Sequence, residues 1–168
     1  MGKEGSTVSE THPSHDPSCG ICRANTLPDP VFANDLWLVR RLPPGIGVPG
    51  WLMLNSRRHV PGIAHFNDEE AANLGPALRH FERVLEEVTG ALRIYTAAMG
   101  ESFPHFHAHL VPRYAAMPGD AKAWAVFDLY RATQQGEVPV DEAETARIAA
   151  VYGEALRQNP PPLTRSAQ

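Results

Sequence analysis

The sequence predicts a single α+β domain, and three observations support this fold class. Short strand-like segments lie on both sides of a long amphipathic segment, a second helical pattern follows near the C-terminus, and 43% of the 168 residues are hydrophobic. A chain of roughly 150 residues buries about two-thirds of its unfolded surface, so one core is expected. We expect a flexible, mostly polar tail over residues 1–17, the main domain over 18–115, an extension packed on that domain over 116–158, and a loose tail over 159–168.

Two short strands are expected to open the sheet. Residues 31–33 and 36–39 are apolar and flank the turn residues Asn34 and Asp35, which is typical of a hairpin. A loop rich in Pro and Gly follows over residues 42–50, and the apolar run 51–54 has the length of a buried strand.

A long helix is predicted between Asn67, whose side chain can cap the first turn, and Gly90. Its apolar positions repeat every three or four residues: Leu74, Leu78, Phe81, Leu85 and Val88. Pro76 cannot donate a backbone hydrogen bond inside a helix, so we expect a break, with Pro76 opening the second piece. We interpret His65 and His80 as surface or capping residues.

The C-terminal half predicts two further strands and a last helix. Residues 92–98 and 105–111 have strand patterns, and Pro112 is expected to stop the second of them. Asp141 with Glu144 three residues later resembles the start of a helix that ends before Asn159. The aromatic residues of the extension are expected in the core rather than in a binding platform: Trp124, Phe127 and Tyr130.

The charge of the chain limits the class of partner. A formal net charge of -4 argues against a general electrostatic attraction to nucleic acid or to anionic lipid. No apolar run approaches the ~20 residues that cross a bilayer, and residues 1–6 lack the hydrophobic stretch of a secretory signal. We therefore expect a cytoplasmic protein that binds neither nucleic acid nor membrane.

The run from His105 to His109 carries three histidines at alternate positions. In a strand these side chains point to one face, and Phe106 and Ala108 point to the other. Because three buried, unpaired histidines would be costly, the histidine face is expected to border a cleft or a metal. Imidazole can attack phosphorus and can protonate a leaving group, so the run suits phosphoryl or nucleotidyl transfer without magnesium.

The segment His105-Phe106-His107-Ala108-His109-Leu110-Val111 resembles the signature of the histidine triad family, and Pro112-Arg113 after it is also similar. Further similarity lies in Cys19-Gly20-Ile21-Cys22, in Pro49-Gly50 before the apolar run, and in residues 56–60, so the resemblance covers about residues 18–115. It implies an antiparallel sheet of about five strands with one main helix, usually paired into a homodimer.

The resemblance also implies an activity. His107 would attack the α-phosphorus of a nucleotide, forming a nucleotidyl-histidine that water or another acceptor resolves, and His109 would contact the phosphate and help the leaving group depart. Dinucleoside polyphosphates and nucleoside phosphoramidates are donors in this family. Two alternatives remain open: a nucleotide-binding regulatory module with little turnover, and a transferase to an acceptor other than water.

Cys19 and Cys22 have a spacing that suits tetrahedral zinc, although a free thiol pair and a redox pair are also compatible with it. The zinc-containing branches of the family join such a pair to a distant histidine and to the first histidine of the run. The corresponding residues here are His59 and His105. Such a site has no open coordination position, so the resemblance implies a structural zinc.

The chain departs from the family pattern around the substrate. Family members often have an amide or small polar residue in the turn before the run; here Ser102 is the candidate phosphate ligand, and Glu101 beside it is unexpected because a carboxylate repels phosphate. The family's ribose-binding acidic or amide residue is replaced by Arg40-Arg41, which is either a solvated strand edge or a contact for distal phosphates. The sequence therefore sets no nucleoside preference.

Overall fold

The computed structural model describes residues 11–163, so the predictions for residues 1–10 and 164–168 lie outside the described residues. The elements in chain order are α1 (Gly20–Asn25), β1 (Phe32–Ala33), β2 (Trp37–Arg41), β3 (Leu52–Ser56), a 3₁₀ turn (Ile63–His65), α2 (Asp68–Thr89), β4 (Arg93–Ala97), β5 (His107–Arg113), a second 3₁₀ turn (Ala123–Ala125), α3 (Val126–Gln134) and α4 (Glu142–Gln158). Within residues 11–163, no helix is both long enough and apolar enough to cross a membrane.

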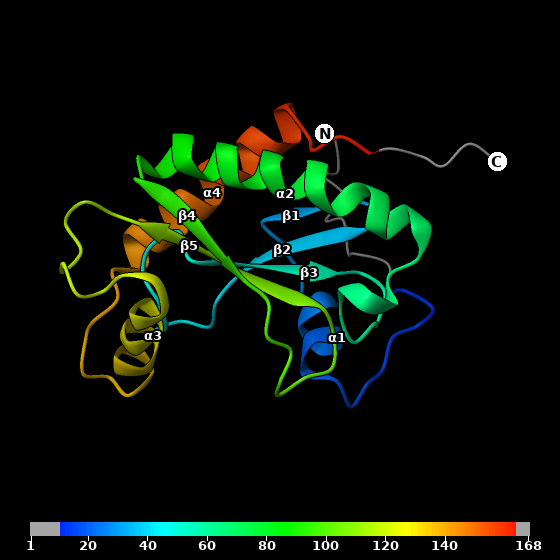
Figure 1. Cartoon of the computed structure of the whole chain (residues 1–168), viewed down its shortest axis with the longest axis horizontal. Helices are drawn as coiled ribbons and strands as arrows, with labels where there is room; N and C mark the ends of the chain where they lie inside the picture. The colour runs from blue at the N-terminus through cyan, green and yellow to red at the C-terminus, as the bar shows by residue number, and fades with distance from the viewer. Residues whose placement is uncertain (1–10, 164–168) are drawn as a thin grey trace, which may run out of the picture.

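The five strands form one antiparallel sheet in the order β1-β2-β3-β5-β4, which confirms the predicted α+β class. Figure 1 shows α2 and α4 on one side of the sheet and α1 and α3 on the other. The main core lies between the sheet and the first helix pair, where Trp37, Phe81, Leu110 and Tyr152 are fully buried. A smaller cluster around Trp51 lies under α3 on the opposite face.

Helix α2 is continuous through Pro76, so the predicted break is wrong. Both ends of the helix are fixed. At the start, Asn67 accepts a hydrogen bond from the Glu70 backbone while the Glu70 carboxylate accepts one from the Asn67 backbone, and at the end Gly90 adopts a left-handed conformation with φ of 64°. With Phe81 and Leu85 buried in the core, packing outweighs the one backbone hydrogen bond that Pro76 cannot make.

Strand β5 begins at His107 and runs through Pro112 to Arg113, which corrects the predicted strand over 105–111 at both ends. Pro112 is tolerated because the pairing with β3 extends only to Leu110, so beyond that point β5 has a single neighbour, β4. His105 lies before the strand, so of the three histidines only His107 and His109 point to the same face of β5.

The C-terminal segment contains α3 and α4. Asp141 caps α4 by accepting a hydrogen bond from the Glu144 backbone, as the sequence predicts. Trp124 is 78% exposed, so the expectation that it lies in the core is wrong. Phe127 and Tyr130, from α3, pack against Trp51 and against His109 of β5. The extension therefore reaches the histidine face of the sheet.

Candidate functional site

His105 is fully buried, and both of its ring nitrogens face polar groups. Nε2 lies 2.9 Å from the backbone oxygen of Ser56, and a carbonyl only accepts, so Nε2 carries the proton. The unprotonated Nδ1 then faces Cys22 Sγ at 3.3 Å and Cys19 Sγ at 3.7 Å. Burial lowers the pKa of His105, which keeps the ring in the neutral form that a metal requires.

Four side chains meet here: the ligand atoms of Cys19, Cys22, His59 and His105 lie within 4.8 Å of one another. Cys19 immediately precedes α1 and Cys22 lies in its first turn, which brings the two thiols together. His59 Nδ1 is 3.3 Å from Cys22 Sγ. Two sulfur and two nitrogen donors in this arrangement fit a tetrahedral metal such as zinc, so the structure brings together all four residues named from the sequence.

The surroundings of the cluster hold its members in place. Arg58, next to His59, donates two hydrogen bonds to the buried carboxylate of Glu70, at 2.9 and 2.6 Å. This ion pair ties the segment after β3 to the start of α2. The pKa of the Cys22 thiol is raised, mainly by burial, so this thiol stays protonated at neutral pH unless a cation takes the place of the proton.

Part of the segment assigned to the N-terminal tail contacts the same cluster. The hydroxyl of Ser14 accepts a hydrogen bond from the backbone of His59 at 2.8 Å, and the backbone of Asp16 donates to Cys22 Sγ at 3.4 Å. His12 and His15 line a small hollow beside Cys22. These contacts were not predicted, because polar sequence alone offers no reason for the segment to pack. The division into tail and domain stays a prediction.

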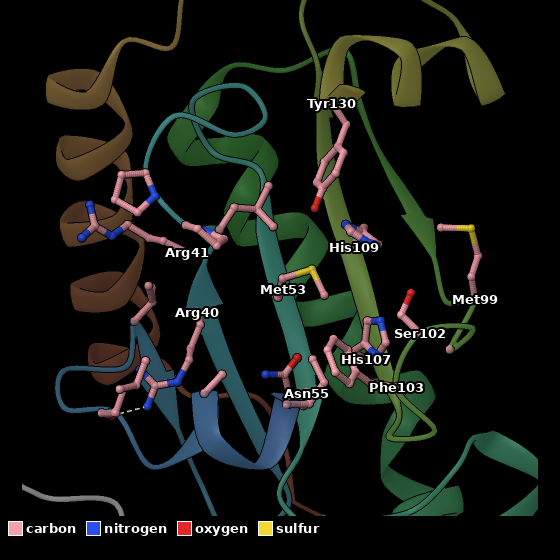
Figure 2. Close-up of a pocket in the computed structure, with 18 of the residues that line it drawn as sticks. Arg40, Arg41, Met53, Asn55, Met99, Ser102, Phe103, His107, His109 and Tyr130 are labelled. Carbon is pink, nitrogen blue, oxygen red and sulfur yellow. Dashed lines mark hydrogen bonds between the residues drawn. The ribbon is translucent and has the colours of Figure 1, made fainter. Parts of the chain in front are cut away.

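The second region is an open cavity of about 740 Å³, which is lined by His107 and His109 and does not include His105. Its floor is the face of the sheet that carries Arg40 of β2, Met53 and Asn55 of β3, and His107 and His109 of β5 (Figure 2). In the strand register Asn55 lies opposite His107, and Met53 lies opposite His109. The wall above β2 is mostly apolar and consists of Ile21, Ala24, Leu27, Pro28 and Val31, with the exposed acidic residue Asp29 among them.

His107 is oriented by one backbone hydrogen bond. Its Nδ1 lies 2.7 Å from the carbonyl oxygen of His105, and since that oxygen can only accept, Nδ1 carries the proton of the neutral ring. Nε2 therefore keeps its lone pair. The ring lines the cavity and is half-buried, so a ligand can reach it. The Nε2 lone pair is therefore available for nucleophilic attack on that ligand.

His109 has the opposite tautomer. The indole N–H of Trp51 can only donate, and it donates to His109 Nδ1 at 3.0 Å, so the proton of the neutral ring lies on Nε2. Burial, and secondly the charge of His107, lowers the pKa of His109 to about 4. At neutral pH His109 is thus a neutral donor. Its ring packs edge-on against Trp51, Phe127 and Tyr130, which hold it in one orientation.

The turn before β5 closes the cavity on the side away from β2. Glu101 and Ser102 line the cavity and are exposed, and Figure 2 shows Ser102 close to His107. Phe103 packs on α1: a Cβ added to Gly20 would lie 2.6 Å from the Phe103 ring. Gly20 thus allows the turn and α1 to approach each other next to Cys19.

Arg40 is not the solvated strand edge that the sequence suggested. Its side chain is 9% exposed, and its guanidinium donates to the backbone oxygens of Asn25, Leu27 and Pro28, which fastens the segment after α1 over β2. Arg41 is exposed and borders the cavity, but its side chain runs toward α4 and away from His109 (Figure 2). Because β2 side chains alternate, two adjacent arginines have different surroundings.

Three cavity features were missed in the sequence. Asn55 of the floor donates to the buried amide of Asn25, and Tyr130 reaches the cavity from α3. The signal for Asn55 in the sequence was a polar residue directly after the apolar run 51–54, still within reach of the predicted strand. No signal marked Tyr130, because its position depends on how the extension folds back.

No family model matches the chain, and no curated protein matches it significantly. Solved structures do match. A Hit-like protein of Bartonella henselae involved in cell-cycle regulation is 13% identical, with a TM-score of 0.59 over 84% of this chain and 98% of its own. A hypothetical histidine triad nucleotide-binding protein of Sulfolobus tokodaii is 12% identical, with a TM-score of 0.55 over 76% and 83%. A zinc-bound histidine triad family protein of Mycobacterium smegmatis is 18% identical, with a TM-score of 0.57 over 84% and 96%.

These likenesses show that the chain has the fold of the histidine triad proteins, which confirms at the level of the fold the resemblance seen in the sequence. At such low identity they show the fold alone. What the site does must be argued from its own residues.

Proposed function

We propose that the protein is a nucleotidyl hydrolase or transferase that acts at the α-phosphorus of a nucleotide, such as a dinucleoside polyphosphate or a nucleoside phosphoramidate, through a covalent intermediate on His107. One observation carries the proposal: the His105 carbonyl holds the proton of His107 on Nδ1, at 2.7 Å, and so leaves Nε2 as a nucleophile at the cavity.

The two tautomers assign the roles. The Nε2 lone pair of His107 forms a bond to phosphorus, and the bond from phosphorus to the leaving group breaks, the leaving group taking the electron pair. The Nε2–H of His109 donates to a phosphate oxygen, where negative charge accumulates. In the second step the oxygen of water, or of another acceptor, bonds to phosphorus and loses its proton to solvent, and the P–N bond returns its electrons to His107. Ser102 supplies a further hydroxyl donor for the phosphate.

We also propose that Cys19, Cys22, His59 and His105 hold a structural zinc ion. A metal there would tie α1, the segment after β3 and the start of β5 to one point, and it would supply no chemistry to the cavity. The Ser56 carbonyl, which fixes the His105 tautomer, is the outer-sphere group that such a ligand needs.

Two further expectations belong to this proposal. The partner is a nucleotide, and because the net charge of the chain is negative, local groups such as His109 and Ser102 must bind its phosphates. A homodimer is expected, and β4 lies at the end of the strand order, where a second chain could add to the sheet. Light scattering of the purified protein tests the dimer.

The test is intact-protein mass spectrometry after rapid mixing with diadenosine tetraphosphate or an adenosine phosphoramidate. A mass increase of one adenylyl group is expected in the wild type and is absent in His107→Ala. An adduct that persists in His107→Ala would contradict the proposal. Nucleotide binding without adduct or turnover would favour the regulatory module, for which the exposed carboxylate of Glu101 at the cavity is the relevant feature. Product analysis with added phosphate or sugar phosphates separates a hydrolase from a transferase.

A further inference from the structure

The amide of Asn55 has one hydrogen-bonding atom that no described residue satisfies. The side chain is 2% exposed, and Oδ1 is buried without a hydrogen-bond partner among residues 11–163. A buried acceptor without a donor destabilises the fold, because it has lost its hydrogen bond to water and gained none in return. Such a cost is expected at a binding site, where a ligand supplies the missing donor.

The orientation of this amide is determined by a chain of hydrogen bonds. Asn25 Nδ2 donates to the Ser56 carbonyl at 3.0 Å, and that oxygen cannot donate, so Asn25 must present Oδ1 on its other side. Asn55 Nδ2 donates to this Oδ1 at 2.9 Å. Turning the Asn55 amide over would bring two oxygens together. The unpartnered atom is therefore the oxygen, and it needs an O–H or N–H donor.

The position of Asn55 indicates which part of a ligand can supply that donor. In the sheet, β3 lies between β5, which carries the two histidines, and β2, over which the apolar wall is fastened by Arg40. β5 and β2 are two strand spacings, about 10 Å, apart. A nucleotide with its phosphate at His107 and its base against the apolar wall must place its sugar over β3.

On the cavity side, β3 presents Met53 and Asn55 (Figure 2). Met53 has no hydrogen-bonding group comparable to an amide oxygen, so Asn55 is the polar group of this strand that a sugar would meet. The unbranched Met53 side chain lies next to Asn55 in Figure 2 and can change rotamer to admit a ligand.

We infer that Asn55 Oδ1 accepts a hydrogen bond from a ribose hydroxyl of the nucleotide, so that the site selects ribonucleotides over deoxyribonucleotides. This inference rests on the proposed function and adds to it a sugar specificity and the residue responsible. The hydroxyl is the 2′ or the 3′ group, and each has its own probe.

The experiment is calorimetric titration of the wild-type protein with 5′-monophosphates, which bind without reacting. The four ribonucleotides establish the base that binds best, and its 2′-deoxy and 3′-deoxy forms are then compared with it. One of the two deoxy forms is expected to bind at least about tenfold more weakly, because it leaves the acceptor buried and unpaired. Wild-type protein that binds all three forms within twofold would overturn the inference.

Two variants sharpen the result. Asn55→Leu has a side chain of similar size without the acceptor, and it is expected to reduce the ratio between ribose and deoxyribose forms to about one. Met53→Leu, the matched control on the same strand and face, changes the shape of the floor without changing its hydrogen bonds, and it should keep the wild-type ratio. An Asn55→Leu protein that still discriminates would overturn the inference.

Failure of the inference is distinguishable from failure of the proposed function. If an adduct forms on His107 with ribose and deoxyribose donors at equal rates, the reaction stands and the role of Asn55 is wrong. If no nucleotide binds to the folded wild-type protein, both are wrong. Should Asn55→Leu not fold, the wild-type comparison of the three sugars still decides the question.

Discussion

The two ends of the histidine run differ in how many ring nitrogens the protein itself uses. His105 has both nitrogens engaged, one by the Ser56 carbonyl and one by the thiols of Cys19 and Cys22, and it is fully buried. His107 and His109 each have one nitrogen engaged, and the rings line the cavity. A ring nitrogen that the fold leaves unused at a cavity is available for chemistry, whereas a fully engaged ring stabilises the structure.

The largest effect expected from this comparison is on chemistry. His107→Ala removes the only nucleophile that the proposed function uses, so the rate of nucleotide cleavage should fall by at least about 10⁴-fold. The melting temperature should change little, because His107 makes a single hydrogen bond to a backbone oxygen. His65→Ala is the matched control, since this histidine is exposed and distant in role. Activity that survives in His107→Ala would break the assignment.

Mutation at the His105 end of the run should have the opposite effect and lower stability more than it lowers the rate of the reaction. Cys22→Ser removes a buried thiol of the proposed zinc site, and loss of a structural metal is among the few causes of destabilisation near 4 kcal/mol, so the melting temperature should fall by roughly 10 °C. Metal analysis should show loss of zinc, and a chelator should lower the melting temperature of the wild type similarly. An unchanged melting temperature with no zinc in the wild type would leave the thiols as a free pair.

Much of this division could be predicted from the sequence, because it depends on local patterns. Alternation predicted that His107 and His109 share a face, and the spacing of Cys19 and Cys22 predicted a chelate. The start of β5 was missed by two residues. Where a strand begins depends on where its neighbour ends, and β3 pairs with β5 only from His107 onward. His105 is consequently free to turn into the cluster.

Other features could not be predicted because they depend on contacts between distant segments. Asn25 and Asn55 are 30 residues apart and meet only when α1 lies over β3. The donor to His109 is Trp51, 58 residues away, immediately before the neighbouring strand β3. Pro76 misled for a related reason: the local cost of a proline is visible in sequence, but the packing of α2 that offsets it is not.

The comparison also predicts a pH dependence of stability. The pKa of His109 is about 4 in the folded protein, below the usual value of 6.5, so between these values the unfolded chain binds the proton more readily. Stability is therefore complete above pH 6.5 and falls as the pH drops toward 4, by at most about 3 kcal/mol. Urea unfolding at pH 7, 5.5 and 4.5 measures this.

His109→Gln is the control for the pH experiment. It should lose less stability than the wild type over the same interval, because the glutamine side chain does not titrate. Acid also weakens metal binding by Cys and His ligands, but equally in both proteins, so the difference between them isolates His109. If the two unfolding free energies fell in parallel, the buried, neutral state of His109 would be contradicted.

The smallest effect tests whether the tautomer of His109 matters to the reaction. Trp51→Phe keeps an aromatic ring in the cluster with Phe127 and Tyr130 but removes the N–H that donates to His109 Nδ1. Losing one such hydrogen bond costs about 1 kcal/mol, so adduct formation on His107 should slow by roughly fivefold. Trp37→Phe is the matched control: Trp37 is fully buried, and its N–H has no partner among the described residues. Equal slowing in both variants would mean that the loss of buried indole volume, and not the loss of the hydrogen bond to His109, slows the reaction. Slowing confined to Trp51→Phe would place the working proton of His109 on Nε2, where it faces the substrate.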